Sequence, residues 1–182
     1  MGQMSIMAKA LERGKHALVM EDDLVFCSDF HERLQIIEAF LAEHPWDVFW
    51  FGATFHVNPA VWHKETLGRD VELTENPSIV RTYGCWSTYC YLVNRESLQG
   101  ILAEHVLRFP QSAGIDTTFI EMQPELHTYA FVPGCVKQYD DYGNVGEGWT
   151  QFSDFSKLGP YWWQDQMDDF DPEAFDWAEA RP

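Results

Sequence analysis

Three consecutive acidic residues, Glu21, Asp22 and Asp23, directly follow the apolar run of residues 17–20. Burying three unpaired carboxylates is costly, and a hard divalent cation such as Mg²⁺ or Mn²⁺ relieves their repulsion with the oxygen ligands it prefers. Side chains alternate along an extended chain, so Glu21 and Asp23 would face one ligand together while Asp22 points away. A solvated turn with helix-capping acids is the alternative interpretation. The position directly after a buried strand favours a metal site formed by this triplet.

A further acidic residue, Asp116, could act as a general base, a group that takes the proton from a reacting hydroxyl. Asp116 is the candidate, since it opens a predicted helix after Gly114. Simple capping of that helix is an equally good explanation for an aspartate there. The sequence therefore leaves both roles open for Asp116.

Several segments, in this order along residues 5–145, resemble glycosyltransferase family 25, the lipooligosaccharide galactosyltransferases. They read Glu-Arg-Gly-Lys at 12–15, Ala-Leu-Val-Met-Glu-Asp-Asp-Leu-Val-Phe at 17–26, Gly-Cys-Trp-Ser-Thr-Tyr-Cys-Tyr-Leu-Val-Asn-Arg at 84–95, Gly-Ile-Asp-Thr-Thr-Phe at 114–119 and Tyr-Ala-Phe-Val-Pro-Gly-Cys-Val-Lys-Gln at 129–138. The resemblance implies a GT-A fold in which Glu21-Asp22-Asp23 is the family's form of the D-x-D motif. The family's usual first strand, of the type Val-Ile-Asn-Leu-Asp-Arg, has no counterpart before residue 21.

The resemblance also implies an activity: metal-dependent transfer of a hexose, galactose or glucose, from a UDP-sugar to a glycan acceptor with inversion, as in lipopolysaccharide biosynthesis. A nucleotide sugar carries a diphosphate, which a protein with a formal net charge of −17 would bind through Mn²⁺ or Mg²⁺. The cation would join Glu21 and Asp23 to the phosphates. Asp116 matches the family's aspartate in its later motif and would be the base.

Four further residues are candidates for substrate binding: Tyr83, Gly84, Trp86 and Gln138. Aromatic faces stack on sugar rings, a glycine permits close approach of the backbone, and a glutamine amide can orient a sugar hydroxyl. For either aromatic side chain taken alone, a place in the core of an aromatic-rich protein is the favoured interpretation. These four residues are thus the predicted contacts to the acceptor and to the donor sugar.

Two other functions remain open. The missing first strand suggests a non-catalytic remnant, a binding or assembly module that kept the fold. A metal-dependent phosphoester hydrolase would use the same triplet and requires Asp140 or Asp141 to lie near Asp23. The partners to expect are a separate N-terminal piece that carries the missing first strand, or a second copy of the chain in a homo-oligomer.

Hydrophobic patterns place these residues on an α/β framework. Strands are expected at residues 17–20, 47–51, 79–83, 87–93 and 128–132. Helices are expected at 3–13, from a cap at Ser28 or Asp29 to Pro45, at 95–106 and at 116–122. Continuous apolar runs suit strands covered on both faces by helices, so a mixed, mainly parallel, Rossmann-like sheet is expected. Its ligand site would lie at the carboxyl ends of the strands.

Charge and composition limit the remaining possibilities. The 182 residues include 29 acidic and 12 basic side chains, which disfavours nucleic acid and anionic membranes as partners. No signal peptide or membrane-spanning run is evident, and four cysteines without metal-site spacing suggest buried thiols in a cytoplasmic protein. Two regions are expected: a glycosyltransferase-like domain at 1–145, and an acidic-aromatic extension at 146–182.

Overall fold

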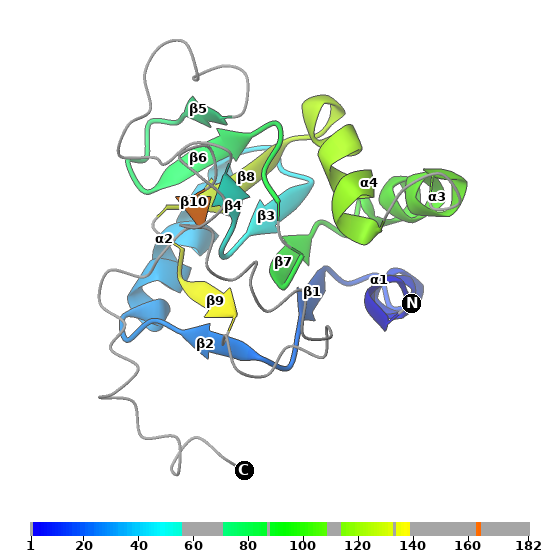
Figure 1. The fold of residues 1–182 in the computed structure, drawn as a ribbon, viewed down its shortest axis with the longest axis horizontal. Coiled ribbons are helices and arrows are strands. Elements are labelled where there is room, and N and C mark those ends of the chain that lie inside the picture. The colour runs from blue at the N-terminus through cyan, green and yellow to red at the C-terminus, as the bar shows by residue number, and fades with distance from the viewer. Residues whose placement is uncertain are drawn as a thin grey trace.

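The computed structural model describes residues 2–55, 71–86, 88–108, 114–132, 134–138 and 163–164. This part of the chain forms an α/β fold with four α-helices and a six-stranded mixed sheet (Figure 1). The helices are α1 (Gly2–Glu12), α2 (Phe30–Glu43), α3 (Leu98–Arg108) and α4 (Ile115–Met122), with the short 3-10 helix η2 (Gln123–Glu125) after α4. The strands are β1 (Ala17–Met20), β2 (Leu24–Phe26), β3 (Val48–Trp50), β4 (Thr54–Phe55), β5 (Val71–Leu73), β6 (Ile79–Thr82), β7 (Cys90–Val93), β8 (Thr128–Phe131), β9 (Val136–Gln138) and β10 (Trp163–Gln164).

The expected helices and strands are confirmed, with ends that shift by a few residues. Gly14 ends α1 as expected and adopts a φ of 61°, which a residue with a side chain rarely adopts. Asp29 is the N-cap residue of α2, but its carboxylate makes no capping bond and pairs instead with Arg33 at 2.7 Å. The first turn of this helix is therefore stabilised by an ion pair one turn along the helix rather than by a side-chain cap.

The main sheet has the strand order β1-β7-β3-β8-β6-β5. The expectation of a mainly parallel sheet is wrong, because the only parallel neighbours in this sheet are β3 and β8. Strand β7 lies between β1 and β3 and runs antiparallel to both. Apolar runs report that a strand is covered on both faces, but they carry no information about its direction.

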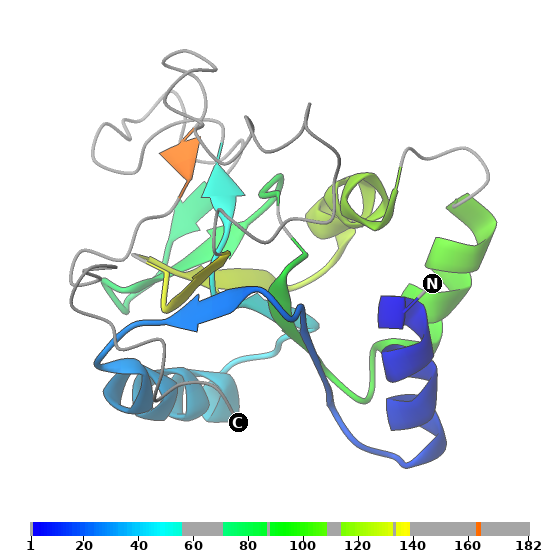
Figure 2. The same ribbon diagram turned by 60° about the horizontal axis from the view of Figure 1, so that its bottom comes forward.

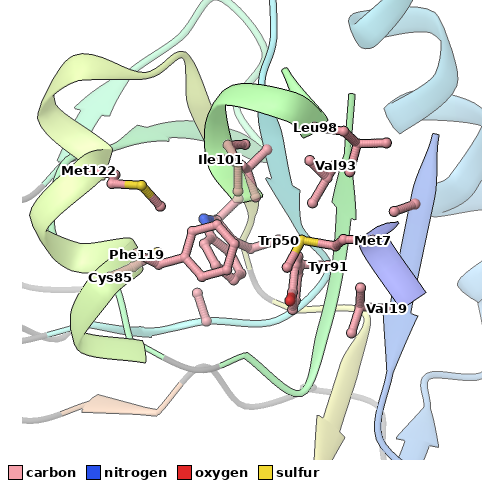
Figure 3. Close-up of a cluster of buried hydrophobic side chains, with 14 of the residues drawn as sticks. Met7, Val19, Trp50, Cys85, Tyr91, Val93, Leu98, Ile101, Phe119 and Met122 are labelled. Atoms are coloured by element: carbon pink, nitrogen blue, oxygen red, sulfur yellow. The ribbon is translucent and has the colours of Figure 1, made fainter. Parts of the chain in front are cut away.

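Helices cover both faces of the sheet (Figure 2). One face packs Trp50, Tyr91 and Val93 against α1, α3 and α4, as Figure 3 shows in close-up. The other face packs Phe49 and Tyr129 against α2. Strand β3 is buried along its whole length, as a central strand between two helical layers must be.

Strand β1 departs from the expected double covering. It lies at an end of the sheet, and its side chains alternate between buried and exposed. Ala17 and Val19 face the helices, whereas Leu18 and Met20 on the other face are 45% and 47% exposed. The four-residue apolar run therefore belongs to an edge strand with one covered face.

A two-stranded sheet of β2 and β9 lies beside the end of β3. The backbone N–H of Cys135 donates to the Phe51 carbonyl at 2.7 Å, which fixes the segment leading into β9. Gly52 makes this approach possible, since a β-carbon there would clash with the Val136 carbonyl oxygen and lie 2.5 Å from the Tyr89 hydroxyl oxygen. The small sheet thus closes over the edge of the main sheet where β1 and β3 end.

Three further expectations concern the chain as a whole. All four cysteines, Cys27, Cys85, Cys90 and Cys135, are buried free thiols. Among the described residues, no helix has both the length and the apolar character needed to cross a membrane. Most of the predicted extension at 146–182 lies outside the described residues, but its strand β10 pairs antiparallel with β4. The division at residue 145 stays a prediction.

Candidate functional site

The triplet Glu21-Asp22-Asp23 directly follows β1, at the edge of the sheet where β1, β3 and β8 all end. Register places Met20 of β1 opposite Cys90 of β7, and Trp50 of β3 is paired with both Tyr91 and Ala130. The carboxyl ends of β1, β3 and β8 therefore lie along the same edge of the sheet. The Glu21 backbone N–H continues the ladder by donating to the Tyr89 carbonyl at 2.9 Å. This is the edge at which open α/β sheets bind ligands.

Glu21 is the most perturbed carboxylate of the triplet. Its pKa is raised from 4.5 to about 7, first by burial and then by the negative charges of Asp23 and Asp116. The charges that raise it come from two segments almost a hundred positions apart in the sequence. The fold therefore brings the predicted metal ligands and the predicted base within electrostatic range of one another.

The three side chains of the triplet differ in exposure. Glu21 and Asp23 are partly buried, whereas Asp22 is exposed. The alternation is that of an extended chain, and the joint role of Glu21 and Asp23 towards one ligand stays a prediction. Asp22 also contributes the weakest of the charges acting on the Glu21 pKa.

Asp116 is the second residue of α4, and Gly114 rather than Asp116 is the N-cap. The Gly114 N–H donates to the Thr117 hydroxyl at 3.1 Å, so this helix end has a partner that does not involve Asp116. Burial raises the pKa of the Asp116 carboxyl, and a hydrogen bond with the Thr88 side chain opposes the rise. Its Oδ1 is buried and has no hydrogen-bond partner among the described residues. A polar atom in that state is suited to accept a proton or to bind a group from a ligand.

Gln3 of α1 forms hydrogen bonds with three residues of this region. Its Nε2 donates to Glu21 Oε1 at 3.0 Å and to the Thr88 carbonyl at 3.1 Å. Its Oε1 accepts a hydrogen bond of 2.9 Å from the Tyr91 hydroxyl. The Thr88 side chain in turn hydrogen-bonds with Asp116, so Gln3 and Thr88 both lie between the two carboxylates, Gln3 bound to the Thr88 backbone and Asp116 to its side chain. We use the name acidic site for Glu21, Asp23 and Asp116 with Gln3 and Thr88.

The predicted Gly84 and Trp86 flank Cys85, on the segment that leads from β6 to the acidic site. The Gln123 side chain holds both backbone groups of Cys85: its Nε2 donates to the carbonyl at 2.7 Å, and its Oε1 accepts from the N–H at 2.9 Å. Burial, with a smaller contribution from the negative charge of Asp116, raises the pKa of the Cys85 thiol to about 12. Gly84 and Trp86 are both partly exposed, and the charge of Asp116 acting on Cys85 is the link between this segment and the acidic site.

Tyr83 is not brought to the acidic site. Thr82 at the end of β6 hydrogen-bonds with Thr128 at the start of β8, so Tyr83 lies at the edge of the sheet opposite to Glu21. Its hydroxyl donates to Glu72 Oε2 at 2.7 Å, and its ring lies 5.0 Å from the guanidinium carbon of Arg81. Tyr83 therefore packs on the surface of the β5–β6 pair, where both of these partners lie.

Gln138, the last predicted substrate-binding residue, ends β9. Its backbone pairs with Leu24, which directly follows Asp23. The pairing brings two segments that are distant in sequence to the same edge of the sheet. Asp140 and Asp141, on which the hydrolase hypothesis depends, lie outside the described residues.

The acidic site fits a divalent cation only in part. In the regions that the structure describes, no three His, Cys, Asp or Glu side chains converge as a complete metal site. Three acids nevertheless share one region, and no cation is among the groups that shift the Glu21 pKa. Mg²⁺ commonly takes one or two protein carboxylates and completes its shell with water and substrate phosphates. The carboxylates present fit that kind of open site.

Gln3, Thr88 and Gln123 were not predicted as functional residues. Gln3 is an ordinary polar residue at the start of an amphipathic helix, and nothing in its sequence context marks it. Thr88 lies in a stretch interpreted as a strand, where threonine is common. Only the packing of α1 against β1 and β7 reveals that Gln3 and Thr88 belong to the acidic site.

Comparison with known proteins adds no family: no family model matches the chain, and no curated protein matches it. The resemblance to glycosyltransferase family 25 therefore rests on the motifs alone.

Proposed function

We propose that the chain is a metal-dependent hexosyltransferase that uses the acidic site to bind a nucleotide-sugar diphosphate and a hydroxyl acceptor. The observation that carries the proposal is Glu21, whose pKa is raised to about 7 by burial and by the charges of Asp23 and Asp116. Keeping three acids in one partly buried region is unfavourable unless a positive charge joins them. A cation that binds there, with phosphate oxygens completing its shell, supplies that charge.

Glu21 and Asp23 would hold Mn²⁺ or Mg²⁺, which when bound stabilises negative charge on a leaving diphosphate. Gln3 would orient Glu21 through its hydrogen bond to Oε1. Asp116 would accept the proton of the acceptor hydroxyl at its Oδ1, which has no hydrogen-bond partner among the described residues. A raised pKa improves Asp116 as a base at neutral pH.

The further details of this proposal come from the resemblance to family 25 rather than from the geometry. They are UDP as the nucleotide, galactose or glucose as the hexose, a glycan acceptor and inversion at the transferred carbon. Gly84, Trp86 and Gln138 remain the proposed contacts to the sugars. The two alternatives, a non-catalytic binding module and a phosphoester hydrolase, make different predictions for the same experiments.

Calorimetry with UDP in the presence of Mn²⁺ tests the binding step. We expect saturable heat for the wild-type chain and none for Asp23→Ala, with Asp22→Ala retaining most of the affinity because Asp22 is exposed. Absence of heat with the wild type, or equal heat with Asp23→Ala, would overturn the proposal. Release of UDP from UDP-galactose or UDP-glucose then separates a transferase from a binding module, since only the transferase turns over in an Asp116-dependent way.

A further inference from the structure

A cavity that is open to solvent lies far from the acidic site. It has a volume of about 410 Å³ and lies between α3 and the segment that joins α4 to β8. Its apolar lining comes from Ile101 and Met122, which are almost fully buried, and from the partly exposed Leu126. Because Asp47, at the amino-terminal end of β3, lines it, the cavity lies at the edge of the sheet opposite to Glu21. The candidate function described above does not involve this cavity.

Four carboxylates line the cavity together with this apolar lining: Asp47, Glu96, Glu104 and Glu125. Two are paired with arginines, Glu96 with Arg95 at 2.9 Å and Glu104 with Arg108 at 2.8 Å. Asp47 accepts hydrogen bonds from the Ser97 hydroxyl and, at 2.7 Å, from the His127 backbone N–H, and its Oδ2 lies 3.5 Å from Nδ1 of the His127 ring. Glu125 is exposed and has no ion pair within the described residues. The lining thus keeps an excess of negative charge.

Gly100 of α3 contributes to the wall of the cavity. A glycine inside a helix is less favourable than alanine by about 1 kcal/mol. Packing does not require it here, because a β-carbon at this position would meet no atom within 4 Å. The effect of Gly100 is to leave open space beside the apolar lining.

We propose that this cavity binds a linear aliphatic polyamine. The methylene chain would lie on Ile101, Met122 and Leu126, and the ammonium groups would reach the surrounding carboxylates. Charge complementarity favours such a ligand over a neutral or anionic one, since the lining is acidic and the whole chain carries a net charge of −17. The volume lies within the range of small-molecule sites.

Spermidine binding to the full-length chain tests the proposal by calorimetry and by amide chemical shifts. We expect one saturable site, with shifts centred on Ser97, Gly100 and Leu126. Affinity should fall as salt rises, since the carboxylates are near solvent. Shifts spread evenly over the acidic surface, or an equal affinity for Mg²⁺ at the same positions, would show unspecific charge attraction and overturn the proposal.

Two variants and one control make the test specific. Gly100→Leu fills the cavity and improves helix propensity, so it should abolish saturable binding without lowering the thermal midpoint. Glu125→Gln removes one charge and should weaken binding about twofold to fivefold. Glu38→Gln, an exposed acid on α2, should leave the affinity unchanged. Unaltered binding in Gly100→Leu, or equal losses in Glu125→Gln and Glu38→Gln, would refute the assignment.

Discussion

Replacing Glu21 with glutamine should stabilise the protein at neutral and alkaline pH. In the folded chain the pKa of Glu21 is raised from 4.5 to about 7, so the folded state holds a proton that the unfolded state has already released. Stability therefore falls as pH rises between 4.5 and 7. Glutamine keeps the shape of the side chain and most of its hydrogen-bonding capacity, but it carries no charge to bury.

The magnitude follows from the shift. A rise from 4.5 to about 7 corresponds to about 3 kcal/mol at alkaline pH, and partial exposure of the side chain reduces this to about 1–3 kcal/mol. Below pH 4.5 the wild type is protonated in both states, so the pH-dependent advantage of Glu21→Gln disappears there. The free energy of unfolding in urea, measured at pH 4.5, 6 and 8 without divalent cation, gives the difference directly.

A control removes the general effect of lowering the net charge. Glu38→Gln changes an exposed acid on α2, so its stability difference from the wild type should stay within about 0.5 kcal/mol at every pH. The reasoning about Glu21 is refuted if Glu21→Gln is no more stable than the wild type at pH 8. It is also refuted if the difference between them is the same at pH 4.5 and pH 8.

Three further outcomes are expected. His105 is fully buried and its pKa is lowered to about 4. The free energy of unfolding of the wild type should therefore decline by up to about 3 kcal/mol as pH falls from 6.5 to 4. In urea titrations, His105→Leu should make this decline smaller. Gly52→Ala forces a β-carbon against the Val136 carbonyl and should lower the free energy of unfolding by about 1–3 kcal/mol, whereas Gly100→Ala should not lower it. Gln3→Leu removes the donor to Glu21 and should cost about 1–3 kcal/mol while weakening Mn²⁺ binding in calorimetry; unchanged binding would remove Gln3 from the acidic site.

His105 and Glu21 change the stability of the protein with pH in opposite directions, so each must be replaced separately. His105 makes stability rise with pH between 4 and 6.5, and Glu21 makes it fall between 4.5 and 7. The two effects partly cancel in the wild type, so a flat profile would hide both. Differences between each variant and the wild type separate them, provided that the two positions act independently.

Element types were predictable because hydrophobic spacing reports burial. The runs at residues 17–20 and 128–132 became β1 and β8, and the apolar stripe after Asp29 became α2. Strand direction was not predictable, since antiparallel β7 between β1 and β3 leaves the same buried pattern as a parallel neighbour would. The pairing of β2 with β9 depends on contacts more than a hundred residues apart, which local patterns do not encode.

The candidate site was predictable as far as local chemistry goes. An acidic triplet after a strand, and an aspartate after a glycine, pointed to Glu21 and Asp116, and the fold places their charges close enough to interact. Tyr83 failed to join them because β6 runs towards the opposite edge of the sheet. Gln3 escaped prediction because its contact with Glu21 arises only when α1 packs beside β1.

The most direct test of the proposed function is to map where Mn²⁺ binds on the full chain. Paramagnetic broadening of amide signals, recorded at low Mn²⁺ concentration with and without UDP, reports the position of the ion. We expect the broadening to centre on residues 21–23, 88 and 116, to strengthen with UDP and to vanish in Asp23→Ala. Broadening centred on the cavity beside α3 instead, or unchanged in Asp23→Ala, would contradict the assignment of the acidic site as the place where cation and donor bind.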